Sequence, residues 1–167
     1  MQRILNIIHY CIYSLHYRFY LKFSRTVNLI AIIHRMPFIK RRYKQQGITV
    51  DDVQKASDEF FGDERAGLYQ GVSSGFVMGG LAVLLFSILS IAGTLILNIT
   101  ISHYHIFTCM LAVVVITHYN IDREDIYIEY FREFKKWSQK ELRTYTVYTL
   151  MTFLGVISLF FVALAIG

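Results

Sequence analysis

The chain has 167 residues, of which 54% are hydrophobic, 16% aromatic and only 17% charged, and its formal net charge is +5. The aromatic content argues against an intrinsically disordered chain, and two cysteines are too few for a small domain built on disulfides. No Lys, Arg, Asp or Glu occurs between Arg65 and Asp122 or from Thr144 to Gly167. Charge-free apolar blocks of this length are typical of membrane-spanning segments, which argues against a soluble single domain.

The two charge-free blocks predict three membrane-spanning helices. A hydrocarbon core of roughly 30 Å needs about 20 apolar residues for each helical crossing. The first block is long enough for two crossings, at 72–97 and 101–119, and the second holds one at 145–166. We therefore predict an all-α integral membrane protein with an amino-terminal interfacial helical region and a long cytoplasmic helix that continues into the third crossing.

This interpretation divides the chain into three regions. Residues 1–66 form a basic, aromatic region at the cytoplasmic side and the interface, and 67–119 form a glycine-rich transmembrane hairpin. Residues 120–167 form an amphipathic cytoplasmic helix followed by the third transmembrane helix.

The basic residues predict the orientation in the membrane. Eleven Lys and Arg lie in residues 1–72 and six in 119–144, whereas 98–105 and the residues after 144 have none. Because cytoplasmic segments carry the excess of Lys and Arg, we place the amino terminus in the cytoplasm and the carboxyl terminus outside. We expect the bacterial inner (cytoplasmic) membrane, with the mitochondrial inner membrane as an alternative.

Residues 1–48 carry nine basic residues and no acidic one. Apolar residues repeat there at helical spacing, which predicts an interfacial helix whose aliphatic face lies among acyl chains. A neighbouring stripe of tyrosines is expected at headgroup depth. Whether residues 4–33 lie on the membrane or dip into it stays open. The aliphatic face consists of Ile4, Ile7, Ile8, Cys11, Ile12, Leu15 and Phe19, and the tyrosines are Tyr10, Tyr13, Tyr17 and Tyr20.

Two groups of basic side chains are the candidate surface for lipid or a partner. Each Lys or Arg beside anionic headgroups contributes on the order of 1 kcal/mol. Tyrosines interleaved with basic residues also suit nucleic acid, whose bases stack on aromatic rings, but the same interleaving is expected at any membrane interface. We therefore favour lipid. The groups are Arg18, Lys22 and Arg25 in the first helix, and Lys40, Arg41, Arg42 and Lys44 further along the chain.

A capping box predicts a short helix after the basic cluster. Thr49 precedes Asp52 by three residues, and the helix is expected to end near Phe61 because Gly62 follows. No His accompanies the acidic residues of this region and no calcium-loop spacing is present, so we predict no metal site and no cofactor. The apolar side of this helix is expected to consist of Val53, Ala56 and Phe60.

Glycines at four-residue intervals form the most specific motif of the chain. A glycine in a soluble helix costs roughly 1 kcal/mol relative to alanine, but in a membrane such a strip lets another helix approach backbone to backbone. Two partners stay open: another crossing of the same chain, or the same strip on an identical subunit in a glycine zipper. The strip consists of Gly67, Gly71, Gly75 and Gly79, and we expect it to continue through Ser87, Ser90 and Gly93.

The segment 119–144 is polar but carries an aromatic face. Asp122 is expected to cap a helix that runs into the third crossing, because neither proline nor glycine intervenes before Phe153. The result would be a rod of about 45 residues, on the order of 65 Å long. Its aromatic face packs either on the protein's own amino-terminal region or on another protomer or protein. That face consists of Tyr127, Tyr130, Phe131, Phe134 and Trp137.

No constellation of catalytic residues emerges from the sequence. The six histidines are scattered, no phosphate-binding glycine loop precedes a basic residue, and no nucleophile elbow is present. The predicted crossings contain no charged residue at mid-membrane depth, which argues against an ion-coupled transporter. We therefore predict a non-enzymatic protein without catalytic, cofactor-binding or metal-binding residues.

Three functions are compatible with these features. The leading hypothesis is a membrane-anchoring or scaffold subunit of a larger assembly that associates through the glycine strip and offers its cytoplasmic side to a protein partner. The first alternative is a homo-oligomeric pore or membrane-perturbing effector, since pores can be lined by backbone, Ser and Thr. The second is an immunity-type inhibitor of a membrane toxin. We expect the lipid membrane and identical or other membrane subunits as partners, and no nucleic acid.

Overall fold

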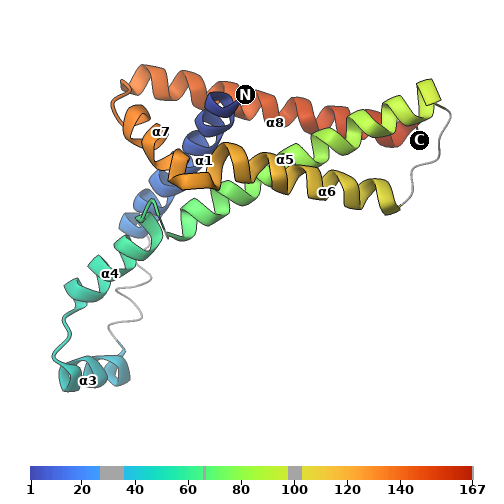
Figure 1. Cartoon of the computed structure of the whole chain (residues 1–167). Coiled ribbons are helices and arrows are strands. Elements are labelled where there is room, and N and C mark those ends of the chain that lie inside the picture. Colours follow the sequence, from blue (N-terminus) through green and yellow to red (C-terminus); the bar gives the residue numbers. More distant parts are fainter. Residues whose placement is uncertain (27–35, 66, 98–102, 167) are drawn as a thin grey trace. The chain divides into compact units, whose positions relative to one another are not determined.

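The computed structural model describes residues 1–26, 36–65, 67–97 and 103–166, and every element in these ranges is helical (Figure 1). In chain order the elements are α1 (Gln2–Thr26), α3 (Pro37–Gln46), α4 (Val50–Gly62), α5 (Leu68–Ala92), the π-helical turn η1 (Gly93–Leu97), α6 (His103–Thr117), the π-helical turn η2 (His118–Asp122), the 3₁₀ turn η3 (Arg123–Asp125), α7 (Ile126–Phe134) and α8 (Gln139–Ile166).

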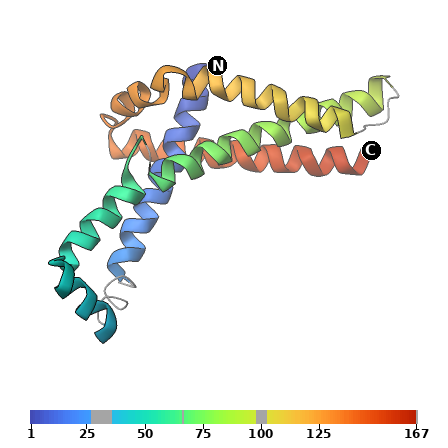
Figure 2. The ribbon, with the colours of Figure 1, turned by 60° about the horizontal axis from the view of Figure 1, so that its bottom comes forward.

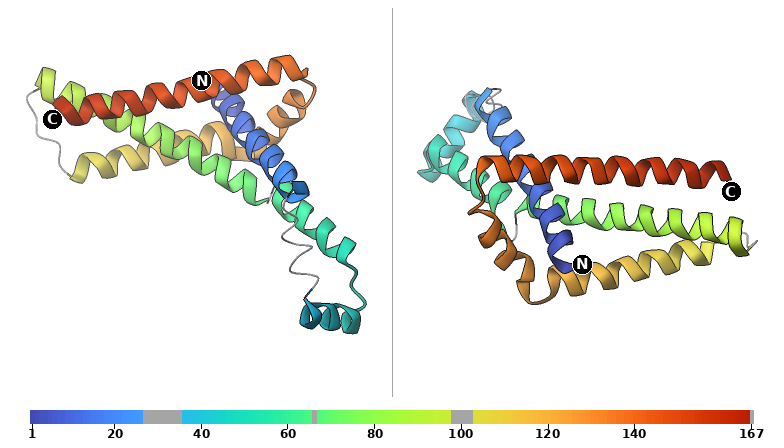
Figure 3. Two further views of the ribbon diagram at one scale, coloured as in Figure 1. Left: turned by 180° about the vertical axis from the view of Figure 1, so that it is seen from behind. Right: turned by 90° about the horizontal axis from the view of Figure 1, so that it is seen from above.

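Three stretches are long and apolar enough to cross a membrane, as the charge-free blocks predict. They are Leu68–Ile96, Tyr104–Asp122 and Gln139–Ile166. Most side chains in these stretches are not buried within the chain, so their apolar surface faces outward. In Figure 3, α5 runs between α6 and α8. Rings connect α5 to α8, where Phe86 lies 6.2 Å from Phe160, centroid to centroid.

The chain divides into two compact units, and α1 and α5 each contribute to both. One unit combines Met1–Ile12 with Ser73–Gly167, and the other consists of Tyr13–Val72. The first unit therefore contains the three apolar helices, except for the first turn of α5, together with α7 and the first half of α1. The second contains the remainder of α1, the helices α3 and α4, and that first turn.

In the first unit, the amino-terminal half of α1 packs against α7 (Figure 2). The centre of this packing is Phe131, which is 0% exposed, with its ring 5.1 Å from His9 and 5.0 Å from Tyr10. Phe134 is 1% exposed and lies 5.6 Å from Tyr10. Aromatic side chains bury a large apolar area at low conformational cost, so this cluster fixes α1 to α7.

This packing changes the role that hydropathy predicts for α1. Ile4, Leu15 and Phe19 are exposed as expected of a lipid-facing side, but Cys11 and Ile12 are buried within the protein. Tyr10 also packs on α7, where the sequence predicts a headgroup contact. The prediction of a lipid or headgroup contact is wrong for these positions, because apolar and aromatic side chains of α1 pack equally well on another aromatic surface of the chain, and α7 supplies that surface.

In the second unit, α4 packs along the later part of α1 through tyrosines. Tyr13 donates a hydrogen bond of 2.6 Å to the carbonyl oxygen of Gly62, and Tyr20 donates one of 2.9 Å to Asp58. The predicted apolar side of α4 is wrong in two of three positions, since Ala56 and Phe60 are exposed. The tyrosine hydroxyls of α1 select the neighbouring side of α4, which offers them a carbonyl and a carboxylate.

The capping box at the start of α4 is confirmed. The Thr49 hydroxyl accepts a hydrogen bond from the backbone N–H of Asp52, and the Asp52 carboxylate accepts one from the backbone N–H of Thr49. Hydrogen bonds from Thr49 hold the pKa of the Asp52 carboxyl below its usual value. The helix ends at Gly62, one residue beyond the predicted end.

The predicted continuous rod is wrong, because the chain breaks between α7 and α8. Helix α7 ends at Phe134 and α8 begins at Gln139. The Ser138 hydroxyl accepts a hydrogen bond from the Glu141 N–H, and the Glu141 carboxylate accepts one of 2.8 Å from the Ser138 N–H. This second capping box starts a new helix at a place that lacks both proline and glycine.

The predicted cap at Asp122 is also wrong. Asp122 ends the π-helical turn η2, and its side chain makes no capping hydrogen bond. Helix α7 instead begins at Ile126 after Asp125, whose backbone adopts a left-handed φ of 56°. Aspartate tolerates this conformation better than most residues, so Asp125 makes the turn where the sequence predicts the first turn of a helix.

Candidate functional site

The candidate site is an open face of glycines on α5. At Gly71, Gly75 and Gly79 an added Cβ atom would meet no other atom within 4 Å, and all three residues are exposed. The helix thus presents bare backbone over two turns. In a membrane such a surface allows another helix to approach closely and to gain van der Waals contact along the groove. We refer to these three residues as the open glycine face.

The other four residues of the predicted strip are buried and do not belong to the open glycine face. Gly67 is buried in the turn before α5, where an added Cβ would collide with the Asp63 backbone. Ser87, Ser90 and Gly93 are buried within the chain, and the Ser87 hydroxyl donates a hydrogen bond of 2.7 Å to the Val83 carbonyl. The structure therefore brings together three of the seven predicted positions as one exposed face.

Gly80 follows the open glycine face directly but serves the contact between α5 and α8. An added Cβ at Gly80 would lie 3.0 Å from Cε1 of the Phe153 ring on α8. Phe153 also lies 6.4 Å from Phe76, centroid to centroid. Of the two adjacent glycines, Gly80 thus allows α8 to approach α5 closely, and Gly79 remains open.

The predicted aromatic face of 119–144 is occupied by the protein's own amino-terminal region, which confirms the intramolecular alternative. Tyr127, Phe131 and Phe134 are buried, and Tyr10 contacts Trp137 at 6.0 Å between ring centroids. Trp137 also stacks on Tyr145 of α8 at 4.5 Å. Tyr130 is half-buried and stacks on Phe134. These rings connect α1, α7 and α8 within the first unit, so the face offers little surface to a partner.

Polar residues that sequence reasoning missed complete this packing. Asn6 is fully buried, and its amide donates 2.9 Å hydrogen bonds to the carbonyl oxygens of Gln2 and Asn120. An exposed ion pair of 2.8 Å joins Arg3 to Glu133. The available signal was the spacing of Asn6, His9 and Tyr10, which share a side of α1 next to its aliphatic face.

Cys11 lies on the same part of α1 and is 1% exposed. Its burial raises the pKa of the thiol, and hydrogen bonds with Thr149 and Thr146 partly offset this effect. A thiol that is both buried and protonated at neutral pH reacts slowly, because the thiolate is the nucleophile. Cys11 therefore contributes packing against α8, and its reactivity reports whether α1 remains in place.

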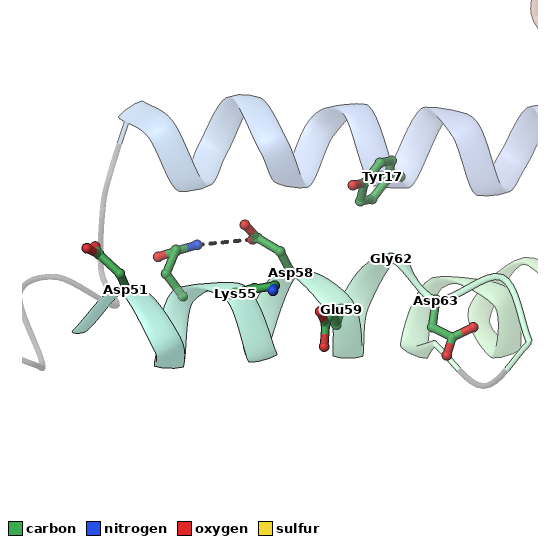
Figure 4. Close-up of a pocket in the computed structure, with 8 residues that line it drawn as sticks. Tyr17, Asp51, Lys55, Asp58, Glu59, Gly62 and Asp63 are labelled. Atoms are coloured by element: carbon green, nitrogen blue, oxygen red, sulfur yellow. Dashed lines mark hydrogen bonds between the residues drawn. The ribbon is translucent and has the colours of Figure 1, made fainter. Parts of the chain in front are cut away.

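A groove in the second unit is lined mainly by residues of α4, and four of its eight lining residues are acidic (Figure 4). Its volume is about 630 Å³. Asp58 accepts a hydrogen bond of 3.0 Å from Gln54 in addition to the one from Tyr20. Within the described ranges no three His, Cys, Asp or Glu residues converge in a way that could hold a metal ion. The lining residues are Tyr17, Asp51, Gln54, Lys55, Asp58, Glu59, Gly62 and Asp63.

The predicted basic surface is exposed where the structure describes it. Arg18 and Lys22 are exposed on the later part of α1, and Arg41, Arg42 and Lys44 are exposed on α3. The side chains of Arg25 and Lys40 lie outside the described residues, as does the segment 27–35, so the predicted course of residues 4–33 is described only to Thr26.

Comparisons of the chain with protein-family models, with curated proteins and with solved structures return no match.

Proposed function

We propose that the protein is a small polytopic membrane protein that acts as a membrane-anchoring or scaffold subunit and assembles through the open glycine face of α5. The observation that carries this proposal is that, apart from the adjoining backbone of α5 itself, no atom lies within 4 Å of an added Cβ at Gly71, Gly75 or Gly79. Three glycines on an apolar helix would only weaken it without a close partner. A helix from a second copy or another membrane subunit provides that partner.

The aromatic packing between α1 and α7 supports an anchoring role. It fixes the first half of the amino-terminal helix to α7, the segment that connects the second and third apolar helices. We place the three spans in the bilayer with the amino terminus and α7 in the cytoplasm. The basic residues on those segments, and their absence from 98–105 and after 144, support this orientation.

Replacement of Gly75 with leucine is expected to reduce the assembled fraction about tenfold or more, since the side chain would fill the groove that the neighbouring helix enters. The change should leave the single chain intact, because nothing lies within 4 Å of this position. Native mass spectrometry of the protein in nanodiscs, with and without co-expressed membrane proteins, measures the number of subunits per particle.

Gly155→Leu is the matched control for this experiment. Gly155 is an exposed glycine on α8 with the same empty surroundings, so the substitution adds the same bulk and helix propensity to a different span. We expect this variant to assemble like the wild type. The proposal fails if the wild type is monomeric and without partners, if Gly75→Leu assembles normally, or if both variants lose assembly equally.

Oligomeric state and conductance also separate the alternatives. A ring of identical subunits that conducts ions in planar bilayers would favour the homo-oligomeric pore, which uses the same open glycine face. A mixed complex that does not conduct would favour the scaffold subunit. Specific capture of a membrane toxin would favour the immunity-type inhibitor.

The orientation is tested with a reporter enzyme that is active only outside the cytoplasm. Fusion after Gly167 is expected to be active, and fusion after Lys136, in the turn between α7 and α8, is expected to be inactive. The reason is that the segment 119–144 carries six basic residues and the chain after it none. The reverse pattern would invert the topology, and activity at both points would mean that α8 does not cross.

A further inference from the structure

Helix α3 is a short, well-delimited helix with an unusual exposed surface. Pro37 occupies its first turn, and Gly47 ends it in a left-handed conformation with φ of 67°. Phe38 is 73% exposed although it is one of the largest apolar side chains of the region. Arg41, Arg42 and Lys44 are exposed on the same helix, whereas Ile39 and Tyr43 are half-buried.

Among the residues that the structure describes, no acidic side chain pairs with the exposed basic residues of α3. Residues 37–48 contain no Asp or Glu. Arg41, Arg42 and Lys44 form no ion pair with any residue that the structure describes. The first acidic residues after α3 in the sequence are Asp51 and Asp52, and the Asp52 carboxylate accepts hydrogen bonds from Thr49 at the start of α4.

Phe38 and Arg42 are arranged as a pair. They are four residues apart on one side of α3, and the Arg42 guanidinium carbon lies 5.9 Å from the centroid of the Phe38 ring. A cation held beside an exposed aromatic ring suits the boundary between lipid headgroups and acyl chains, where the ring enters the apolar layer and the guanidinium binds phosphate oxygens.

We propose that α3 docks on an anionic lipid surface, with Arg41, Arg42 and Lys44 at the phosphates and Phe38 below them. Charge complementarity selects this occupant, because the helix is purely basic and anionic headgroups present a continuous negative surface. Nucleic acid is the weaker candidate, since binding of single strands uses several stacking rings along a groove and α3 exposes one. This docking is independent of the open glycine face and of the number of subunits.

The test compares the full-length protein in nanodiscs of phosphatidylcholine with and without phosphatidylglycerol. Trypsin cleavage after Arg41, Arg42 and Lys44 is measured relative to cleavage after the exposed Lys136 between α7 and α8. Docking is expected to slow relative cleavage of α3 about tenfold or more in anionic discs, and high salt should reverse the effect. Equal relative cleavage in both kinds of disc would overturn the proposal.

Two phenylalanine variants separate docking from a general attraction of basic residues to lipid. Phe38→Gln should remove most of the protection, because the apolar anchor is lost. Phe60→Gln is the matched control, since Phe60 is also exposed, at 60%, but lies on α4 beside acidic residues. Loss of protection in neither variant, or in both, would contradict the assigned role of Phe38. Protection by a single-stranded oligonucleotide in neutral discs, without protection by phosphatidylglycerol, would replace lipid with nucleic acid.

Discussion

Replacement of Phe131 with alanine is expected to lower the free energy of unfolding by about 3–5 kcal/mol, the cost of removing a large aromatic side chain from a packed core. Phe131 is 0% exposed and its ring contacts those of His9, Tyr10 and Tyr127. The substitution would loosen α1 from α7, because the contacts of the ring with His9 and Tyr10 of α1 are lost together. Unfolding in mild detergent, followed by circular dichroism, measures the loss.

Cys11 provides a second readout for the same variant. Its thiol is buried and its pKa is raised by that burial, so a water-soluble maleimide should label it slowly in the wild type. Release of α1 in Phe131→Ala should accelerate labelling of Cys11.

Phe107→Ala is the control for both readouts, because Phe107 is 71% exposed on α6 and its removal leaves no cavity. The two variants should differ in stability by several kcal/mol. Equal stability, or unchanged labelling of Cys11 in Phe131→Ala, would mean that α1 is not held by this aromatic cluster.

The three candidate membrane-spanning helices were predictable because one physical requirement dominates their sequences. A helix that crosses the hydrocarbon core must lack charge over about 20 residues, and this leaves a pattern that needs no tertiary information. The helical stretches Leu68–Ile96, Tyr104–Asp122 and Gln139–Ile166, which are long and apolar enough to cross a membrane, agree with the predicted crossings apart from the ends. The ends depend on capping and turns, which are local and weaker signals.

The break between α7 and α8 was also present in the sequence as a pattern. Ser138 and Glu141 have the same spacing as Thr49 and Asp52, and both pairs form capping boxes. The continuous rod followed from treating proline and glycine as the only breaks. A serine three residues before a glutamate also starts a helix by binding its free N–H groups, even where the chain could continue without interruption.

Helix geometry excludes Ser87 from the face of the three glycines, whereas Ser90 and Gly93 leave that face because they are buried by packing within the chain. An α-helix turns by about 100° for each residue, so a step of four residues advances about 40° around the axis. Gly71, Gly75 and Gly79 therefore stay on one side, but Ser87 lies about 160° from Gly71 on a regular helix. The structure accordingly exposes the first three and buries Ser87. Which side is covered depends on how α5 packs against α6 and α8, and sequence spacing does not determine this.

The adjacent residues Gly79 and Gly80 should respond in opposite ways to the same substitution. Gly80→Leu is expected to lower the free energy of unfolding of the single chain by about 1–3 kcal/mol, as overpacking does in well-packed contacts. The new side chain would extend beyond a Cβ that is already 3.0 Å from the Phe153 ring. Gly79→Leu meets open space, so the single chain should keep its stability while assembly through the open glycine face is lost.

A smaller residue at position 153 should relieve the overpacking specifically. In the double variant Gly80→Leu with Phe153→Leu, the space vacated by the ring can accept the new side chain. The loss in free energy of unfolding should therefore be smaller than the sum of the two single losses by about 0.5–3 kcal/mol. Thermal unfolding of the four proteins in the same detergent completes the cycle. Additive effects would show that Gly80 and Phe153 do not share a contact, and a loss of stability in Gly79→Leu equal to that of Gly80→Leu would mean that α5 is rotated from its described position. The contrast therefore tests the packing on which the assignment of the open glycine face depends, without requiring that any partner be known.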